Sequence, residues 1–92
     1  MIKNFKDKHT QMLFERKRAL KWKHIEKLAW KASQYLNSAE MLQDSTVFSG
    51  LQLEKLKGNR KGQYSIRISK QYRICFWWKN GHAYEVEIAD YH

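Results

Sequence analysis

One stretch in the second half of the chain decides the fold: Tyr72-Arg73-Ile74-Cys75-Phe76-Trp77-Trp78-Lys79-Asn80-Gly81-His82-Ala83-Tyr84-Glu85-Val86-Glu87-Ile88. Apolar or aromatic side chains occupy alternate positions on both sides of Asn80-Gly81, namely Tyr72, Ile74, Phe76 and Trp78 before it and Tyr84, Val86 and Ile88 after it. A period of two is that of a strand with one apolar face. Asn-Gly favours a type I′ turn because both central positions need positive φ. The stretch therefore predicts a β-hairpin.

A further strand precedes this hairpin. Tyr64, Ile66 and Ile68 alternate with polar residues, and residues 69–71 read as a turn into the hairpin. The period of two begins near Leu51, and Ile2 to Phe5 suits a short first strand. We expect an antiparallel sheet of about four to five strands.

The first half of the chain has helical periodicity. A polar helix is predicted near residues 7–18, with Met12 and Leu13 inward. A second helix is predicted from apolar residues that recur at steps of three and four and so form one face of the helix. These residues are Ile25, Leu28, Ala29, Ala32, Leu36 and Ala39. Residues 37–50 predict a short helix and loops, with Val47 and Phe48 over the core. The chain is thus predicted to be one α+β domain over residues 1–92, with the sheet packed on two N-terminal helices.

The amino-acid composition limits the kinds of partner that the protein can bind. The chain of 92 residues has 18 Lys and Arg against 9 Asp and Glu, a formal net charge of +9. Such a field favours a polyanion: RNA, DNA or an anionic membrane surface. The alternatives are a charge for solubility or an acidic protein partner. No apolar run is long enough to span a membrane, the N-terminus lacks a secretory signal, and Cys75 is the single cysteine. We therefore expect a cytoplasmic protein that binds nucleic acid or the ribosome.

Four basic side chains in the second half of the chain are suited to binding phosphate. Lys57, Arg60 and Lys61 lie in the glycine-bearing segment 57–62, whose glycines let the backbone approach a ligand. This segment has neither P-loop spacing nor a following helix, and it also suits an ordinary exposed hairpin loop. Arg73 lies mid-strand, opposite the apolar face, where a guanidinium can bind phosphate in bidentate fashion. The alternative for Arg73 is an ion pair with Glu85 or Glu87.

The chain ends in Asp90-Tyr91-His92. A carboxylate and an imidazole can transfer protons near neutral pH. The alternative is that these terminal residues have no function, as is common at chain ends. Strict alternation puts Asp90 and His92 on the apolar face, so they reach the side of Arg73 only if the strand ends or bulges near Ala89.

Three further features are less specific. Lys23, Lys27 and Lys31 form a stripe that either meets phosphates or is simply solvated. Trp77 lies on the Arg73 face, where it suits stacking on a base, core packing or a partner contact. The histidines have no metal-ligand spacing, and we expect no metal and no cofactor.

Several motifs together resemble a known family. They are Met1-Ile2-Lys3-Asn4-Phe5, Leu56-Lys57-Gly58-Asn59-Arg60-Lys61-Gly62-Gln63-Tyr64, Tyr72-Arg73-Ile74, Asn80-Gly81-His82-Ala83-Tyr84 and Asp90-Tyr91-His92. The chain resembles the HigB-like toxins, the plasmid maintenance killer branch of the RelE/ParE superfamily, over nearly its whole length. The resemblance implies a RelE-like, microbial-RNase-like fold. It also implies a toxin of a type II toxin–antitoxin module that is a ribosome-dependent mRNA endoribonuclease (an mRNA interferase).

The implied partners are the 70S ribosome with its mRNA and a cognate helix-turn-helix antitoxin of the HigA type, with DNA contacted only through the antitoxin complex. The implied catalytic roles are phosphate stabilisation for Lys57 and Arg73, proton transfer for Asp90 and His92, and shaping of the site for Tyr91. Where the family often reads Leu-His-Pro-Leu-Lys-Gly, this chain reads Leu53-Glu54-Lys55-Leu56-Lys57-Gly58. Glu54 therefore becomes an alternative base.

The implied mechanism is attack of the ribose 2′-hydroxyl on the adjacent phosphorus without a metal ion. Two competing classes are a non-catalytic RNA- or ribosome-binding protein, which needs the charge but not the acid–base groups, and a ParE-like gyrase inhibitor.

Overall fold

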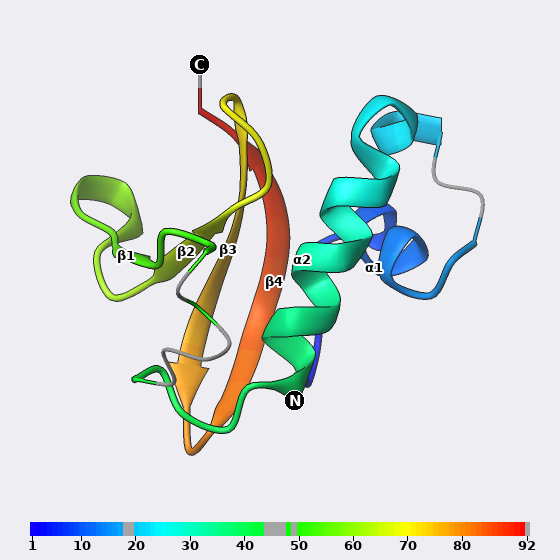
Figure 1. Cartoon of the computed structure of the whole chain (residues 1–92). Helices are drawn as coiled ribbons and strands as arrows, with labels where there is room; N and C mark the ends of the chain where they lie inside the picture. The colour runs from blue at the N-terminus through cyan, green and yellow to red at the C-terminus, as the bar shows by residue number, and fades with distance from the viewer. Residues whose placement is uncertain (18–19, 44–47, 49, 92) are drawn as a thin grey trace.

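The fold has two layers, and the computed structural model describes residues 1–17, 20–43, 48 and 50–91. In Figure 1 the helices cover one face of the sheet, while the loop that carries η2 lies away from the helices, beyond the β1 edge of the sheet. The elements in chain order are α1 (Lys8–Phe14), the 3-10 helix η1 (Leu20–Ile25), α2 (Glu26–Ser38), β1 (Glu54–Lys55), the 3-10 helix η2 (Gly58–Arg60), β2 (Tyr64–Arg67), β3 (Tyr72–Lys79) and β4 (His82–Asp90). The predicted α+β class is confirmed.

The sheet is antiparallel, with strand order β1-β2-β3-β4. β3 and β4 form the predicted hairpin, and Asn80 (φ 53°) and Gly81 (φ 80°) at its turn both have the positive φ that a type I′ turn needs. The expected first strand is reduced to two isolated parallel bridges, from Ile2 to Ala83 and from Phe5 to Val86. The N-terminal segment therefore lies along the outer edge of β4.

The predicted alternation of β4 is wrong at one position. Cys75 pairs with Glu87, but two residues later Trp77 pairs with Tyr84, so β4 contains one extra residue. Glu85 in this bulge has φ 52°. A bulge reverses the facing of the residues beyond it, so Tyr84 shares the face of Trp77. Ala83, which is fully buried, lies on the core side instead.

The helices follow their predicted apolar faces with two differences. Asp7 caps α1 by accepting a hydrogen bond from the backbone N–H of Thr10 at 2.8 Å, and the helix ends at Phe14, earlier than expected. In α2 the prediction that Leu28 faces inward is wrong, since its side chain is 55% exposed. Ser33 is buried in its place and satisfies its hydroxyl by donating to the carbonyl of Trp30 at 2.6 Å. The buried face of α2 is thus centred on Ala29, Ala32 and Leu36.

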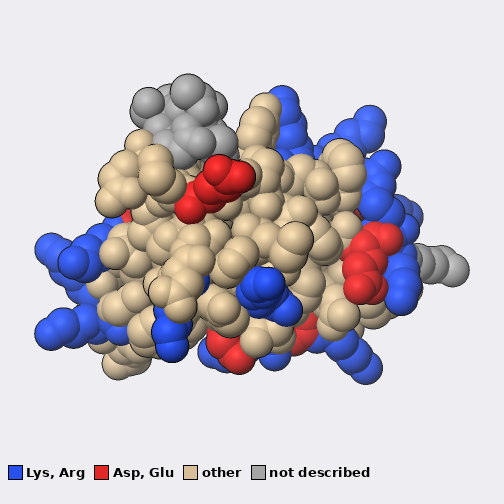
Figure 2. All heavy atoms as spheres, turned by 90° about the horizontal axis from the view of Figure 1, so that it is seen from below, with Lys and Arg blue, Asp and Glu red and all other residues tan. Residues whose placement is uncertain are grey.

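Basic side chains lie at both ends of the molecule. Figure 2, seen from below, has blue side chains at its left end, the side of the β1–β2 loop, and at its right end, the side of the helices. Acidic side chains are fewer on this face. In the part of the chain that the structure describes, no helix is both long enough and apolar enough to cross a bilayer.

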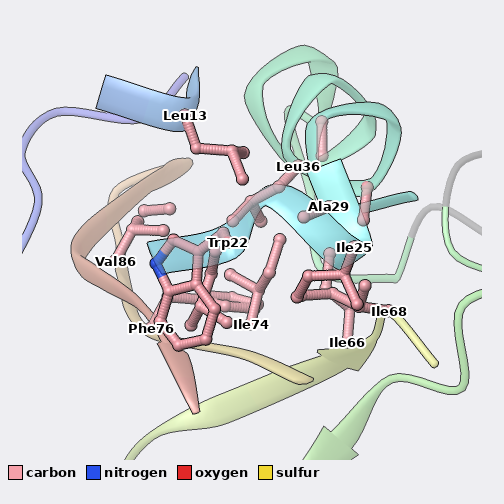
Figure 3. Close-up of a cluster of buried hydrophobic side chains, with 14 of the residues drawn as sticks. Leu13, Trp22, Ile25, Ala29, Leu36, Ile66, Ile68, Ile74, Phe76 and Val86 are labelled. Carbon is pink, nitrogen blue, oxygen red and sulfur yellow. The ribbon is translucent and has the colours of Figure 1, made fainter. Parts of the chain in front are cut away.

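The core lies between the helices and the sheet. Leu13, Trp22 and Leu36 from the helical layer meet Ile74, Phe76 and Val86 from the strands (Figure 3). Phe48 is buried as expected, whereas Val47 lies outside the described residues. The far face of the sheet also has buried residues, and these include the polar Ser65 and the charged Arg73.

Candidate functional site

The face of the sheet that turns away from the helices carries polar side chains in cross-strand rows. Residues directly opposite each other on antiparallel strands project to the same side. One row crosses all four strands and consists of Glu54, Ser65, Cys75 and Glu87. The next row consists of Arg67, Arg73 and Ala89. This arrangement brings the expected phosphate ligand Arg73 together with the alternative base Glu54.

Arg73 is buried and held by oxygen atoms. The residue is only 8% exposed, and its Nε donates to Oγ of Ser65 at 2.6 Å. Its Nη2 donates to the backbone carbonyls of Gln52, at 2.5 Å, and of Ser65, at 3.3 Å. The Glu54 carboxylate lies 3.9 Å from the same Nη2 and is largely exposed. Because the oxygens that accept its hydrogen bonds are neutral, they orient the guanidinium without neutralising its positive charge.

A second arginine lies directly opposite Arg73. Arg67 on β2 is its cross-strand partner, and like charges in such positions repel. Arg67 has no ion pair with any carboxylate of the described residues. Sequence reasoning missed this pair, although a signal existed: the predicted turn at 69–71 is centred midway between the two arginines. Two adjacent guanidinium groups favour binding of an anion at this position.

The basic loop between β1 and β2 folds onto the same face. Nη1 of Arg60 pairs with Oε1 of Glu87 at 2.5 Å and so reaches over β2 and β3 to β4. Glu87 holds the pKa of Arg60 above its usual value, mainly through this hydrogen bond. Lys57 and Lys61 are exposed and form no ion pair with the described residues. Arg60 thus braces the loop, while the two lysines remain available to a ligand.

Tyr91 also lies over this face. Its hydroxyl is 3.5 Å from Sγ of the fully buried Cys75. Burial raises the pKa of the Cys75 thiol. Burial, together with the contact to Cys75, raises the pKa of Tyr91 to about 12. The Tyr91 hydroxyl is therefore protonated at neutral pH and has no basic form there.

Asp90 lies on the opposite side of the sheet. It pairs with Tyr72, and its carboxylate accepts hydrogen bonds from Nε2 of Gln71 at 3.1 and 3.2 Å. The bulge of β4 is at Glu85 and not near Ala89, so alternation continues through Asp90. The structure does not bring Asp90 to the side of Arg73, and the predicted role of His92 lies outside the described residues.

The lysine stripe belongs to the helical layer. Lys23 lies in η1, and Lys27 and Lys31 lie in α2; all three are exposed. They are separated from Arg73 by the thickness of the core. The structure therefore does not bring these three lysines to the Arg73 site (Figure 1).

Comparison with known proteins adds an independent result. A family model described as the RelE-like toxin of the type II toxin–antitoxin system HigB matches residues 3–92. Toxin HigB-1 of Vibrio cholerae is 35% identical over 85 residues, which cover 90% of each chain. A protein named Endoribonuclease HigB, from Proteus vulgaris, is 30% identical over an alignment of 94 positions that covers 100% of both chains. This basic α+β domain belongs to the family of RelE-like HigB toxins of type II toxin–antitoxin systems.

Proposed function

We propose that this toxin is an endoribonuclease that cuts mRNA on the ribosome, with the Arg73 face of the sheet as its active site. The observation that carries the proposal is the juxtaposition of Arg67 and Arg73, two cations directly opposite each other on adjacent strands. Arg73 is fixed by Ser65 and Gln52 before any ligand arrives. The name of the relative, Endoribonuclease HigB, supports a ribonucleic acid as the anion.

The proposed reaction is transfer of a phosphodiester to the neighbouring ribose hydroxyl. A base removes the 2′-hydroxyl proton, the 2′-oxygen bonds to the adjacent phosphorus, and the bond to the 5′-oxygen breaks. The leaving 5′-oxygen takes a proton from an acid, which leaves a 2′,3′-cyclic phosphate. Arg73 and Lys57 stabilise the negative charge that develops on the phosphorane oxygens.

Glu54 is the base that the geometry favours. Its carboxylate is exposed and lies beside the Arg73 guanidinium, so a phosphate bound there has a carboxylate next to it. Asp90 is the cross-strand partner of Tyr72 and therefore lies on the other side of the sheet. His92, the expected imidazole, follows Tyr91 and serves as the acid in this scheme. Tyr91 shapes the end of the site as a neutral phenol.

The partners follow from the same proposal. Membership of a type II toxin–antitoxin family implies an antitoxin. We propose a helix-turn-helix antitoxin of the HigA type, through which alone the toxin meets DNA. The 70S ribosome would position mRNA on the basic face, because precise orientation of the reacting groups lowers the barrier. The exposed lysines Lys23, Lys27 and Lys31 would contact ribosomal RNA.

Primer extension on a translated reporter tests the proposal, with the same reporter lacking its start codon as the comparison. Induction of the toxin should produce cuts only in the translated transcript. Arg73→Ala and Lys57→Ala should each reduce cutting by roughly 10²–10³-fold, the usual loss for one preorganised charge. Lys79→Ala, an exposed lysine of the β3–β4 hairpin, is the matched control and should cut normally.

Three results would contradict the proposal in different ways. Equal cutting of both transcripts would remove the ribosome dependence. Growth arrest without RNA cutting but with damaged DNA would indicate a gyrase inhibitor. Ribosome binding without any cut, and with Arg73→Ala as toxic as the parent, would indicate a non-catalytic binder.

A further inference from the structure

An exposed tryptophan and a half-buried tyrosine extend the Arg73 face along β3 and β4. Trp77 is 43% exposed and lies on the interior strand β3, one residue beyond the last pair of β3 with β2. Its cross-strand partner is Tyr84, which the bulge at Glu85 has turned away from the core. Without the extra residue, Tyr84 would face the helices. The bulge therefore places Trp77 and Tyr84 at opposite positions of adjacent strands, on the face that carries Arg73.

The indole of Trp77 rests on a glycine of the basic loop. A Cβ at Gly62 would lie 2.6 Å from Cζ3 of Trp77, closer than real Cβ atoms approach, and 3.1 Å from Cη2, which is a tight contact. Gly62 also has φ +98°, a conformation that favours glycine. The ring is consequently packed against the backbone next to Lys61, while much of it faces solvent.

The position of this pair relative to Arg73 is fixed by the strand. Trp77 and Arg73 are four residues apart on β3, roughly 13 Å at the usual rise of a strand. Between them lie Cys75 and the contact from Arg60 to Glu87. An RNA strand with one phosphate bound at Arg73 therefore has a neighbouring nucleotide within reach of Trp77. Cations beside an exposed ring are the usual elements of a single-strand binding surface.

We propose that Trp77, flanked by Tyr84, is a stacking platform for a base of single-stranded RNA next to the bond that is cut. This inference rests on the proposed function for its ligand and assigns to that site a subsite for a neighbouring base. Stacking requires only a π-face, so the platform adds affinity for any base and prefers purines by their larger area. Tyr91, at the other end of the same face, marks the opposite limit of the site.

Binding of an uncleavable ligand tests the platform separately from catalysis. The probe is a fluorescent 2′-O-methyl octaadenylate, whose blocked 2′-oxygen cannot attack, and the comparison ligand is an abasic chain of the same length. We expect the intact chain to bind the octaadenylate more tightly than the abasic chain. Trp77→Leu should weaken binding of the octaadenylate by about 5- to 150-fold, the range of single base–aromatic stacks, and should leave the abasic chain unaffected. Trp77→Phe should lose less.

Two controls separate stacking from charge and from folding. Tyr35→Leu removes an aromatic ring of similar exposure, 40%, from α2 and should bind like the parent. The slope of affinity against salt should be the same for Trp77→Leu and the parent, because no phosphate contact is lost. Circular dichroism of Trp77→Phe and Trp77→Leu checks that both fold.

The platform is wrong if folded Trp77→Leu binds octaadenylate as tightly as the parent, or if the parent does not distinguish it from the abasic chain. A loss of antitoxin binding alone would instead make Trp77 a protein contact. If the parent binds RNA through Trp77 but never cuts mRNA on ribosomes, the platform holds and the proposed nuclease function fails. If the parent cuts mRNA but Trp77→Leu binds and cuts identically, the proposed nuclease function holds and the platform fails.

Discussion

Ser65 and Arg73 are joined across the β2–β3 hairpin by a hydrogen bond of 2.6 Å from Nε to Oγ, at a position where the serine is fully buried. We expect Ser65→Ala to leave this buried N–H unpaired, at a cost of about 1–3 kcal/mol in the free energy of unfolding. Because the guanidinium is then less well oriented, the rate of RNA cutting should fall roughly 10–100-fold. Urea denaturation and reporter cleavage measure the two effects.

A double-mutant cycle with Arg73→Ala supplies the control. In that background Ser65→Ala removes no bond, so its cost in stability should be small. An equal cost in both backgrounds would show that the serine acts through packing and not through Arg73.

Proton transfer is predicted to depend on Glu54. Glu54→Gln keeps the shape of the side chain but removes its basicity, and it should reduce cutting by roughly 10²–10⁴-fold. Asp90→Asn should have a much smaller effect, since Asp90 lies on the other side of the sheet. Deletion of His92 should also remove most cutting if the imidazole is the acid. A large loss in Asp90→Asn together with normal cutting by Glu54→Gln would return the base to Asp90.

Stability should fall at alkaline pH through Tyr91. A tyrosine in the unfolded chain has a pKa of about 10, and burial raises the pKa of Tyr91 to about 12 in the folded chain. Between these values the folded state binds the proton that the unfolded state has lost, so stability present below about pH 10 is lost as the pH rises towards 12. Burial raises the pKa of Cys75 and adds a change of the same sign.

Urea unfolding from about pH 8 to about pH 11 tests this prediction. Tyr91→Phe cannot ionise, so its stability should fall less steeply than that of the parent. Tyr35→Phe, on the helical layer, should retain the steep dependence. Parallel curves for the parent and Tyr91→Phe would mean that water reaches the Tyr91 hydroxyl freely.

The two glycines of the basic loop should differ in their tolerance of alanine. Gly58 has φ +64°, and a methyl group added there would meet no atom within 4 Å, so Gly58→Ala carries only the cost of a left-handed backbone, about 1–2 kcal/mol. Gly62→Ala additionally forces the Trp77 ring to move, and overpacking of this kind costs about 1–3 kcal/mol more. Urea midpoints of the two variants and the parent measure both losses. Equal losses would show that the indole moves aside freely.

The lysines of the helical layer are predicted to control ribosome affinity. Changing Lys23, Lys27 and Lys31 to Glu should weaken association with ribosomes and flatten its dependence on salt, because fewer counterions are released. The same change at Lys3, Lys8 and Lys79 alters the net charge equally at other exposed sites. If the two triple variants behave alike, only the total charge matters and the stripe is solvated surface.

Periodicity and turn chemistry determined much of this protein from the sequence by itself. The β3–β4 hairpin follows from alternation and Asn80-Gly81, and α2 follows from its apolar face, because these signals are local. Charge and motif together pointed to phosphate and to Arg73. The family found by comparison agrees with the one that the motifs resemble.

Only the tertiary structure decided how the face around Arg73 is assembled. The bulge at Glu85 depends on how β4 packs against both β3 and the N-terminal segment, so alternation within one strand does not reveal it. The same packing turns Tyr84 towards Trp77 and keeps Asp90 on the other side. Ser65 becomes a partner of Arg73 only through strand register, and Arg60 meets Glu87 only because the loop crosses two strands. These contacts join residues distant in sequence, and their geometry is set by packing rather than by local propensity.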